Sequence, residues 1–79
     1  MKTYLIYNYK TGYIFRHISW YKRDEKGNIT AGTDNSPTFY YPVNVFPAIF
    51  QISKEKFEQI KDNYYDYKII NHKLIKKTQ

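Results

Sequence analysis

The sequence has 79 residues, no cysteine and a formal net charge of +6, from 13 lysines and arginines against 7 acidic residues. This length fits a single domain, and the lack of thiols excludes disulfides and thiolate metal sites. A core of this size is marginal without cross-links, so the aromatic residues, 20% of the chain, are expected to build it.

The first third of the chain predicts a β-hairpin. Residues 3–9 alternate as a strand, Gly12 suits the left-handed position of a short loop, and the following run, 13–21, is rich in β-branched and aromatic residues. In that second strand, the side chains expected to point inward are Ile14, Ile18 and Trp20. A charged turn, a short third strand at 29–31 and a loop rich in small polar residues are expected to follow.

The middle of the chain changes from extended segments to a helix. Residues 38–41 are expected to be extended, and the spacing of Pro42 and Pro47 fits an edge strand or an irregular crossing. Ser53 is a good N-cap for a helix over about 54–63. An apolar stripe along this helix predicts that one of its faces packs on a sheet.

Two short β-rich runs close the chain. They flank Asn71 and His72, which suit a tight turn, and the resulting register sets Ile69 opposite Leu74. We therefore predict one α+β domain over residues 1–79. It comprises a small antiparallel sheet of four or five strands with the helix packed on one face.

Motifs for catalysis, metal binding and cofactor binding are missing from the sequence. The three glycines stand alone, so there is no phosphate-cradling loop, and neither histidine has an acidic residue within four positions. Asp62 and Asp66 could share a cation, but such a site usually draws more oxygen ligands. We predict a non-enzymatic protein with no cofactor, no metal and no small-molecule substrate.

Charge and hydropathy give expectations about partners and compartment. The excess of lysine favours anionic partners, either nucleic acid or an acidic protein or nucleoprotein, with solubility alone as the other explanation. No apolar run is long enough for a signal peptide or a membrane span, which predicts a cytoplasmic protein without membrane contact. Lys, Asn, Ile and Tyr fill nearly half of the chain, and their A/T-rich codons indicate an AT-rich genome, such as that of a low-GC bacterium or one of its phages.

Rings and cations interleave in the N-terminal hairpin, and lysines cluster at the C-terminal end. Single-stranded nucleic acid is held by rings that stack on bases and by cations that neutralise phosphates. The candidate nucleic-acid-binding residues are Tyr7, Tyr9, Lys10, Tyr13, Phe15, Arg16, Lys22, Arg23, Lys68, Lys73, Lys76 and Lys77. The alternative is that the rings are core or cross-strand pairs and that the lysines protect a sheet edge.

Two groups of tyrosines give a further signal. Tyrosine is enriched in protein interfaces because it buries a large area at low entropic cost. The candidate interface residues are Tyr40, Tyr41, Tyr64, Tyr65 and Tyr67. The sequence favours an accessory protein of viral or phage type that binds nucleic acid or a nucleoprotein and could inhibit a host system in the host cytoplasm. The alternative is a structural or assembly protein that acts through protein contacts and homo-oligomerisation, a homodimer included.

Overall fold

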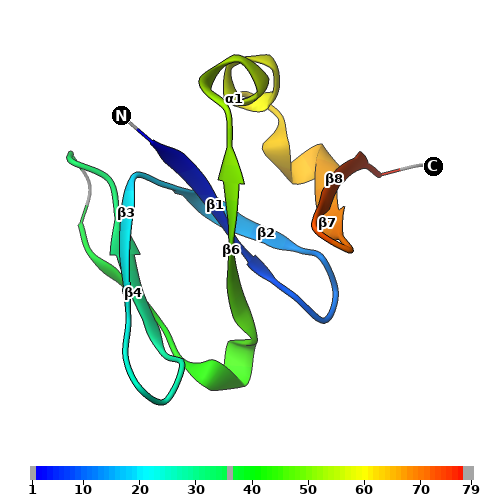
Figure 1. Cartoon of the computed structure of the whole chain (residues 1–79). Helices are drawn as coiled ribbons and strands as arrows, with labels where there is room; N and C mark the ends of the chain where they lie inside the picture. Colours follow the sequence, from blue (N-terminus) through cyan, green and yellow to red (C-terminus); the bar gives the residue numbers. More distant parts are fainter. Residues whose placement is uncertain (1, 36, 78–79) are drawn as a thin grey trace.

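Eight strands in three small sheets and one α-helix make up the part of the chain that the computed structural model describes, residues 2–35 and 37–77 (Figure 1). The strands are β1 (Thr3–Asn8), β2 (Ile14–Ile18), β3 (Trp20–Arg23), β4 (Ile29–Gly32), β5 (Phe39–Tyr41), β6 (Pro47–Ile52), β7 (Tyr67–Ile70) and β8 (Lys73–Lys76). The helix is α1 (Lys54–Ile60), and two 3₁₀ turns are η1 (Val43–Val45) and η2 (Tyr64–Asp66).

The first sheet lies at the centre of the molecule, with strand order β2–β1–β6 and antiparallel pairing throughout. At Ser19 the chain passes from β2 into β3 and forms a second antiparallel sheet, β3–β4–β5, before η1 returns it to β6. Figure 1 shows β3 and β4 on one side of the crossing of β1 and β6, and α1, β7 and β8 on the other. The central sheet is therefore covered on both faces.

Strand β1 separates two hydrophobic cores because its side chains alternate between the two faces of the sheet. The first core, toward α1 and β7, contains the buried residues Leu5, Tyr7, Ile14, Ile52, Ile60 and Ile69. The second core, toward β4, contains the buried residues Ile6, Ile18, Ile29 and Ala31. With apolar side chains on both faces of β1, one covering layer could not remove them all from water.

A bulge in β2 distributes its side chains over both cores. The pairing with β1 shifts between Arg16 and Ile14, so Phe15 is the extra residue. The inward orientation predicted for Ile14 and Ile18 is confirmed, although the two side chains lie in different cores. Trp20 is only half-buried, and its indole ring lies against Gly32, which faces it from β4.

The predicted α+β class is confirmed, but the predicted single sheet of four or five strands is wrong. The chain turns at Ser19, where the backbone N–H donates to the carbonyl of Gly32 at 2.8 Å. This turn places β3–β5 in a separate layer over the central sheet. The segment between Pro42 and Pro47 is a 3₁₀ turn that ends at Phe46 in the left-handed region, with φ of 55°.

The C-terminal elements follow the local sequence signals closely. Ser53 caps α1 by accepting a hydrogen bond from the backbone N–H of Lys56 at 3.1 Å. The helix ends at Ile60, short of the predicted 63, because the chain turns there into η2. The predicted register of β7 and β8 is confirmed, with Asn71 and His72 both at positive φ. None of the described residues belongs to a helix long and apolar enough to cross a membrane.

Candidate binding surface

A continuous row of aromatic rings crosses the outer edge of β2. Its members come from β5, from β2 and the residue before it, and from η2, and each ring contacts the next. We call this row the aromatic strip, and it consists in order of Tyr41, Phe15, Tyr13, Tyr65 and Tyr64. Two of its contacts are nearly parallel: Phe15–Tyr41 at 5.3 Å and 22°, and Tyr13–Tyr65 at 6.3 Å and 28° between ring planes.

Hydrogen bonds fix both ends of the aromatic strip to β2. The Tyr64 hydroxyl donates to that of Tyr65 at 3.1 Å, and the Tyr65 hydroxyl donates to the backbone carbonyl of Phe15 at 3.0 Å. At the other end, Arg16 Nε donates to the Tyr41 hydroxyl at 2.8 Å. Because the bulge in β2 adds one residue, Phe15 and Arg16 both reach toward β5.

Burial shifts the pKa values of two neighbouring groups at the Tyr64 end of the aromatic strip. Burial, with a smaller effect from the hydrogen bond to Tyr65, raises the pKa of Tyr64 far above its usual 10. His17 lies next to it, with ring centroids 5.0 Å from Phe57 and 6.2 Å from Tyr64. Burial, and then the positive charge of Arg16, lowers the pKa of His17 below 6.5.

Lysines of the C-terminal hairpin lie beside the outer rings. Lys77 Nζ is 5.6 Å from the centroid of the Tyr13 ring. The backbone of Tyr13 forms an antiparallel bridge with that of Lys68. Tyr13 and Tyr65 are 47% and 49% exposed, so both rings are accessible from solvent next to these cations. The structure thus brings Tyr65, a candidate interface residue, together with the candidate nucleic-acid-binding residues Tyr13 and Lys77. Two of the remaining lysines, Lys73 and Lys76, are exposed on β8.

One predicted ring does not belong to any surface. Tyr7 is 4% exposed and lies in the first core with Ile60 of α1, so the prediction that it stacks on a base is wrong. The reason is that Tyr7 faces the layer that α1 and β7 form over the central sheet. Tyr67 is half-buried and packs against the same core. Tyr40 is 61% exposed on β5, outside the aromatic strip.

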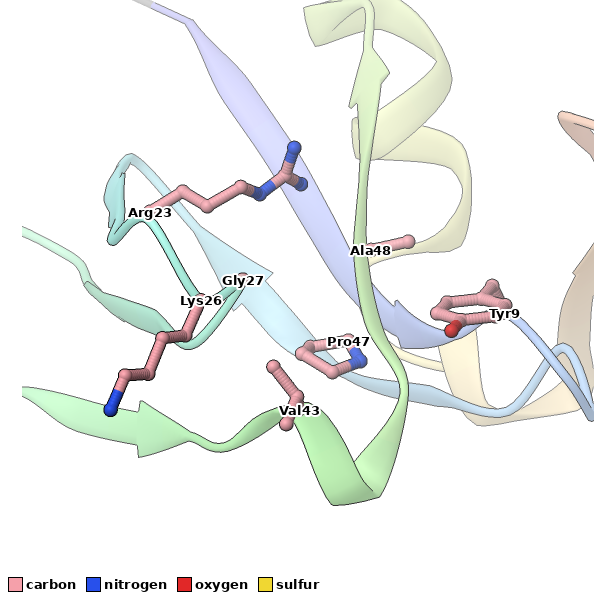
Figure 2. A pocket seen from close by; sticks show the side chains of 7 residues that line it. All are labelled: Tyr9, Arg23, Lys26, Gly27, Val43, Pro47 and Ala48. Atoms are coloured by element: carbon pink, nitrogen blue, oxygen red, sulfur yellow. The ribbon is translucent and has the colours of Figure 1, made fainter.

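The other predicted cations and Tyr9 lie away from the aromatic strip. Tyr9 packs edge-on against Phe46 at 5.7 Å, and Lys10 Nζ is 4.7 Å from the centroid of the same ring. Tyr9 and Arg23 line a pocket of about 520 Å³ (Figure 2). Lys22 is exposed on β3 and does not line this pocket. The predicted nucleic-acid-binding residues therefore do not form one continuous surface.

Two phenylalanines that the sequence analysis did not select take part in these surfaces. The guanidinium of Arg16 lies 3.6 Å from the centroid of the Phe39 ring, and Phe46 lies under Lys10. Both pairings join segments far apart in sequence, so local spacing gives no signal for them. Among the described residues, no group of three or more His, Asp or Glu side chains could hold a metal ion.

Comparisons with known proteins add no relative. No family model, no curated protein and no solved structure matches this chain.

Proposed function

We propose that the chain is a non-enzymatic binding protein that holds single-stranded nucleic acid on the aromatic strip. The observation that carries the proposal is the position of Lys77, whose ammonium lies 5.6 Å from the centroid of the Tyr13 ring, beside the nearly parallel ring of Tyr65. Half-exposed rings next to lysines provide stacking surfaces for bases and positive charge for phosphates. The net charge of +6 supports the same class of partner.

This arrangement favours binding without sequence preference. Every base has a face that can stack on tyrosine, and lysine neutralises phosphate as a point charge without reading base edges. The four lysines of the hairpin and its C-terminal continuation are Lys68, Lys73, Lys76 and Lys77. We expect them to make binding strongly salt-dependent, with a slope of log K against log salt near −0.7 for each phosphate contact to a single strand.

The test is fluorescence anisotropy of labelled single-stranded DNA and RNA at salt concentrations from about 50 to 200 mM. Tyr13→Leu is expected to weaken binding on the order of tenfold, since stacking contributes roughly 1–3 kcal/mol per base. Tyr40→Leu removes an exposed tyrosine outside the aromatic strip and is expected to bind normally. Binding that is absent, that ignores salt, or that falls equally in both variants would refute the proposal.

A second candidate function is self-association through the same surface. The observation that favours it is the exposure of Tyr13 and Tyr65, at 47% and 49%, because exposed tyrosines are typical of interface centres. Sedimentation equilibrium of the free protein tests it: a dimer that Tyr65→Lys dissociates supports this candidate. A monomer at all concentrations that nevertheless binds oligonucleotide excludes it in favour of the first.

A further inference from the structure

The pocket at the start of β6 has a cationic end and an aromatic end. Arg23 and Lys26 come from β3 and the turn that follows it, Val43 from η1 and Pro47 from β6, and Tyr9 follows β1. Figure 2 shows Arg23 and Tyr9 at opposite ends, with Val43 and Pro47 between them. The volume of about 520 Å³ lies within the range of small-molecule sites.

The cationic end is not neutralised within the described part of the chain. No acidic side chain is among the described residues that line the pocket. The nearest carboxylate in sequence, Asp24, is engaged in its own turn, where it accepts hydrogen bonds from the backbone N–H groups of Lys26 at 3.0 Å and Asn28 at 2.9 Å. Its second oxygen accepts from the Asn28 side chain at 2.9 Å. The Arg23 guanidinium, for which the described residues supply no ion-pair partner within 4.0 Å, is therefore open to an external anion.

The other end offers a ring. Tyr9 is 57% exposed and is supported from one side by the edge-on contact with Phe46. Between the two ends, Val43 approaches Gly27 so closely that a Cβ on the glycine would lie 3.2 Å from Val43 Cγ1. Gly27 also has φ of +94°, so a side chain there would be strained as well as crowded. Gly27 and Val43 thus form one closely packed wall of the pocket.

We propose that this pocket binds a mononucleotide, with its phosphate on Arg23 and its base on Tyr9. Arginine presents a planar fork that matches phosphate oxygens in pairs, and tyrosine stacks on bases of any kind. Lys26 also lines the pocket, but its side chain extends away from the Arg23 guanidinium (Figure 2), so Arg23 alone is assigned to the phosphate. The inference is independent of the function proposed for the aromatic strip, since none of the strip residues lines this pocket. It also revises the sequence-based expectation that the protein has no small-molecule partner.

The test is a titration of ¹⁵N-labelled protein with adenosine monophosphate, ribose 5-phosphate and inorganic phosphate, followed in two-dimensional amide spectra. The amides of Gly27, Val43 and Ala48 are expected to shift with adenosine monophosphate. Its affinity is expected to be roughly tenfold higher than that of ribose 5-phosphate, because only the nucleotide has a base to stack. Equal affinities would refute the proposed stacking of the base on Tyr9. Shifts confined to β7 and β8 would refute binding in the pocket.

Matched variants test the contributions of Arg23 and Tyr9 to nucleotide binding separately. Arg23→Gln and Tyr9→Ala are each expected to weaken nucleotide binding about tenfold. Lys22 and Tyr40 are exposed residues outside the pocket, so Lys22→Gln and Tyr40→Ala should leave the affinity for the nucleotide unchanged. The amide spectra also report whether each variant is folded. Equal losses in Arg23→Gln and Lys22→Gln would overturn the proposal in favour of nonspecific charge. Tyr13→Leu is expected to bind the nucleotide normally, so failure of the pocket and failure of the aromatic strip remain distinguishable.

Discussion

Two layers cover the central sheet of this protein, and they are attached to it in different ways. The layer β3–β5 is inserted between β2 and β6, so the chain ties it to the sheet at both ends. The layer of α1, η2, β7 and β8 follows β6, and among residues 2–35 and 37–77 the chain joins it to the sheet at Ser53, with packing and hydrogen bonds holding the remainder. We call them the inserted layer and the terminal layer. Because the described chain joins the terminal layer to the sheet at one point and the inserted layer at two, the terminal layer is expected to open first.

This difference matters because the aromatic strip spans both layers. Tyr41 belongs to the inserted layer, Tyr64 and Tyr65 belong to the terminal layer, and Phe15 in β2 joins them. Local opening of the terminal layer would separate Tyr65 from Tyr13 and remove the paired rings from the surface. The proposed binding site is therefore expected to depend on the weaker of the two attachments.

The largest effects are expected from the two neighbouring residues of β1 that fill opposite cores. Leu5 and Ile6 are both 0% exposed, and each alanine substitution should lower the free energy of unfolding by about 2–5 kcal/mol. In a domain of this size such a loss approaches the total free energy of unfolding. Because β1 contributes to both cores, each variant should unfold in one transition. Urea denaturation followed by circular dichroism measures this, with Gln51→Ala on β6 as an exposed control. Two separate transitions in Leu5→Ala would show that the inserted layer folds without the terminal one.

The contact of Gly12 with β7 docks the terminal layer on the first hairpin. Gly12 has φ of +84°, and a Cβ there would lie 2.9 Å from both the Ile69 carbonyl oxygen and Ile70 Cδ1. Gly12→Ala should therefore cost about 2–3 kcal/mol, from backbone strain and displacement of β7 together. Gly27→Ala, with similar φ but only a side-chain neighbour at 3.2 Å, should cost about 1 kcal/mol.

Hydrogen exchange gives the decisive measurement for this pair of glycines. Faster exchange across β7 and β8 is expected in Gly12→Ala alone, because only that substitution pushes the terminal layer away. If both variants lost the same stability with uniform exchange, positive φ alone would explain the cost and the docking role of Gly12 would be wrong.

The hydrogen bonds of two tyrosine hydroxyls allow the attachments of the two layers to β2 to be compared directly. Tyr41→Phe leaves the partly buried Arg16 Nε without its acceptor at 2.8 Å and should cost about 1.5 kcal/mol, since the donor is charged. Tyr65→Phe removes two exposed hydrogen bonds, the one to the Phe15 carbonyl and the one from the Tyr64 hydroxyl, and should cost about 0.5 kcal/mol because water replaces both. Thermal unfolding of the two variants and the double variant tests the order. A larger loss in Tyr65→Phe would reverse the ranking of the two attachments.

The sequence predicts the terminal layer better than the inserted one, for physical reasons. The Ser53 cap and the Asn71–His72 turn are local, and each determines its own geometry within a few residues. The second sheet depends on how the chain turns at Ser19, and the pairing of β4 with β5 joins residues across a loop. Strand periodicity predicts α+β but carries no information on how strands divide among sheets.

The candidate sites show the same limit. Tyr7 and Tyr9 share a residue type and are two positions apart, which places them on one face of an extended strand. Tyr7 is nevertheless 4% exposed and Tyr9 57% exposed, because Tyr7 lies in the core beneath α1 whereas Tyr9 follows the end of β1. The meeting of Tyr13 with Tyr65 likewise follows from the docking of the terminal layer on β2. Residue types predict a candidate binding surface, but packing determines which side chains are exposed on it.

The smallest predicted effect is a dependence of stability on pH that arises on the terminal-layer side of β2. The His17 ring lies against Phe57 and Tyr64, and burial together with Arg16 lowers its pKa in the folded protein below 6.5. Between that lower value and 6.5 the unfolded chain binds more protons than the folded one, so the free energy of unfolding decreases as the pH falls. The effect is expected to be small because His17 is an exposed residue, so burial contributes little.

Urea denaturation at about pH 7.5 and pH 5.5 measures this dependence, in a window above the titration of most carboxylates. The wild-type protein should lose more stability across it than His17→Gln, whereas His72→Gln, in the exposed β7–β8 turn, should retain the wild-type loss. An equal loss in all three proteins would assign the pH dependence to groups other than His17. A selective effect of His17→Gln would assign the pH dependence to the ring that packs on Phe57 and Tyr64, and binding to the aromatic strip should then weaken over the same pH range.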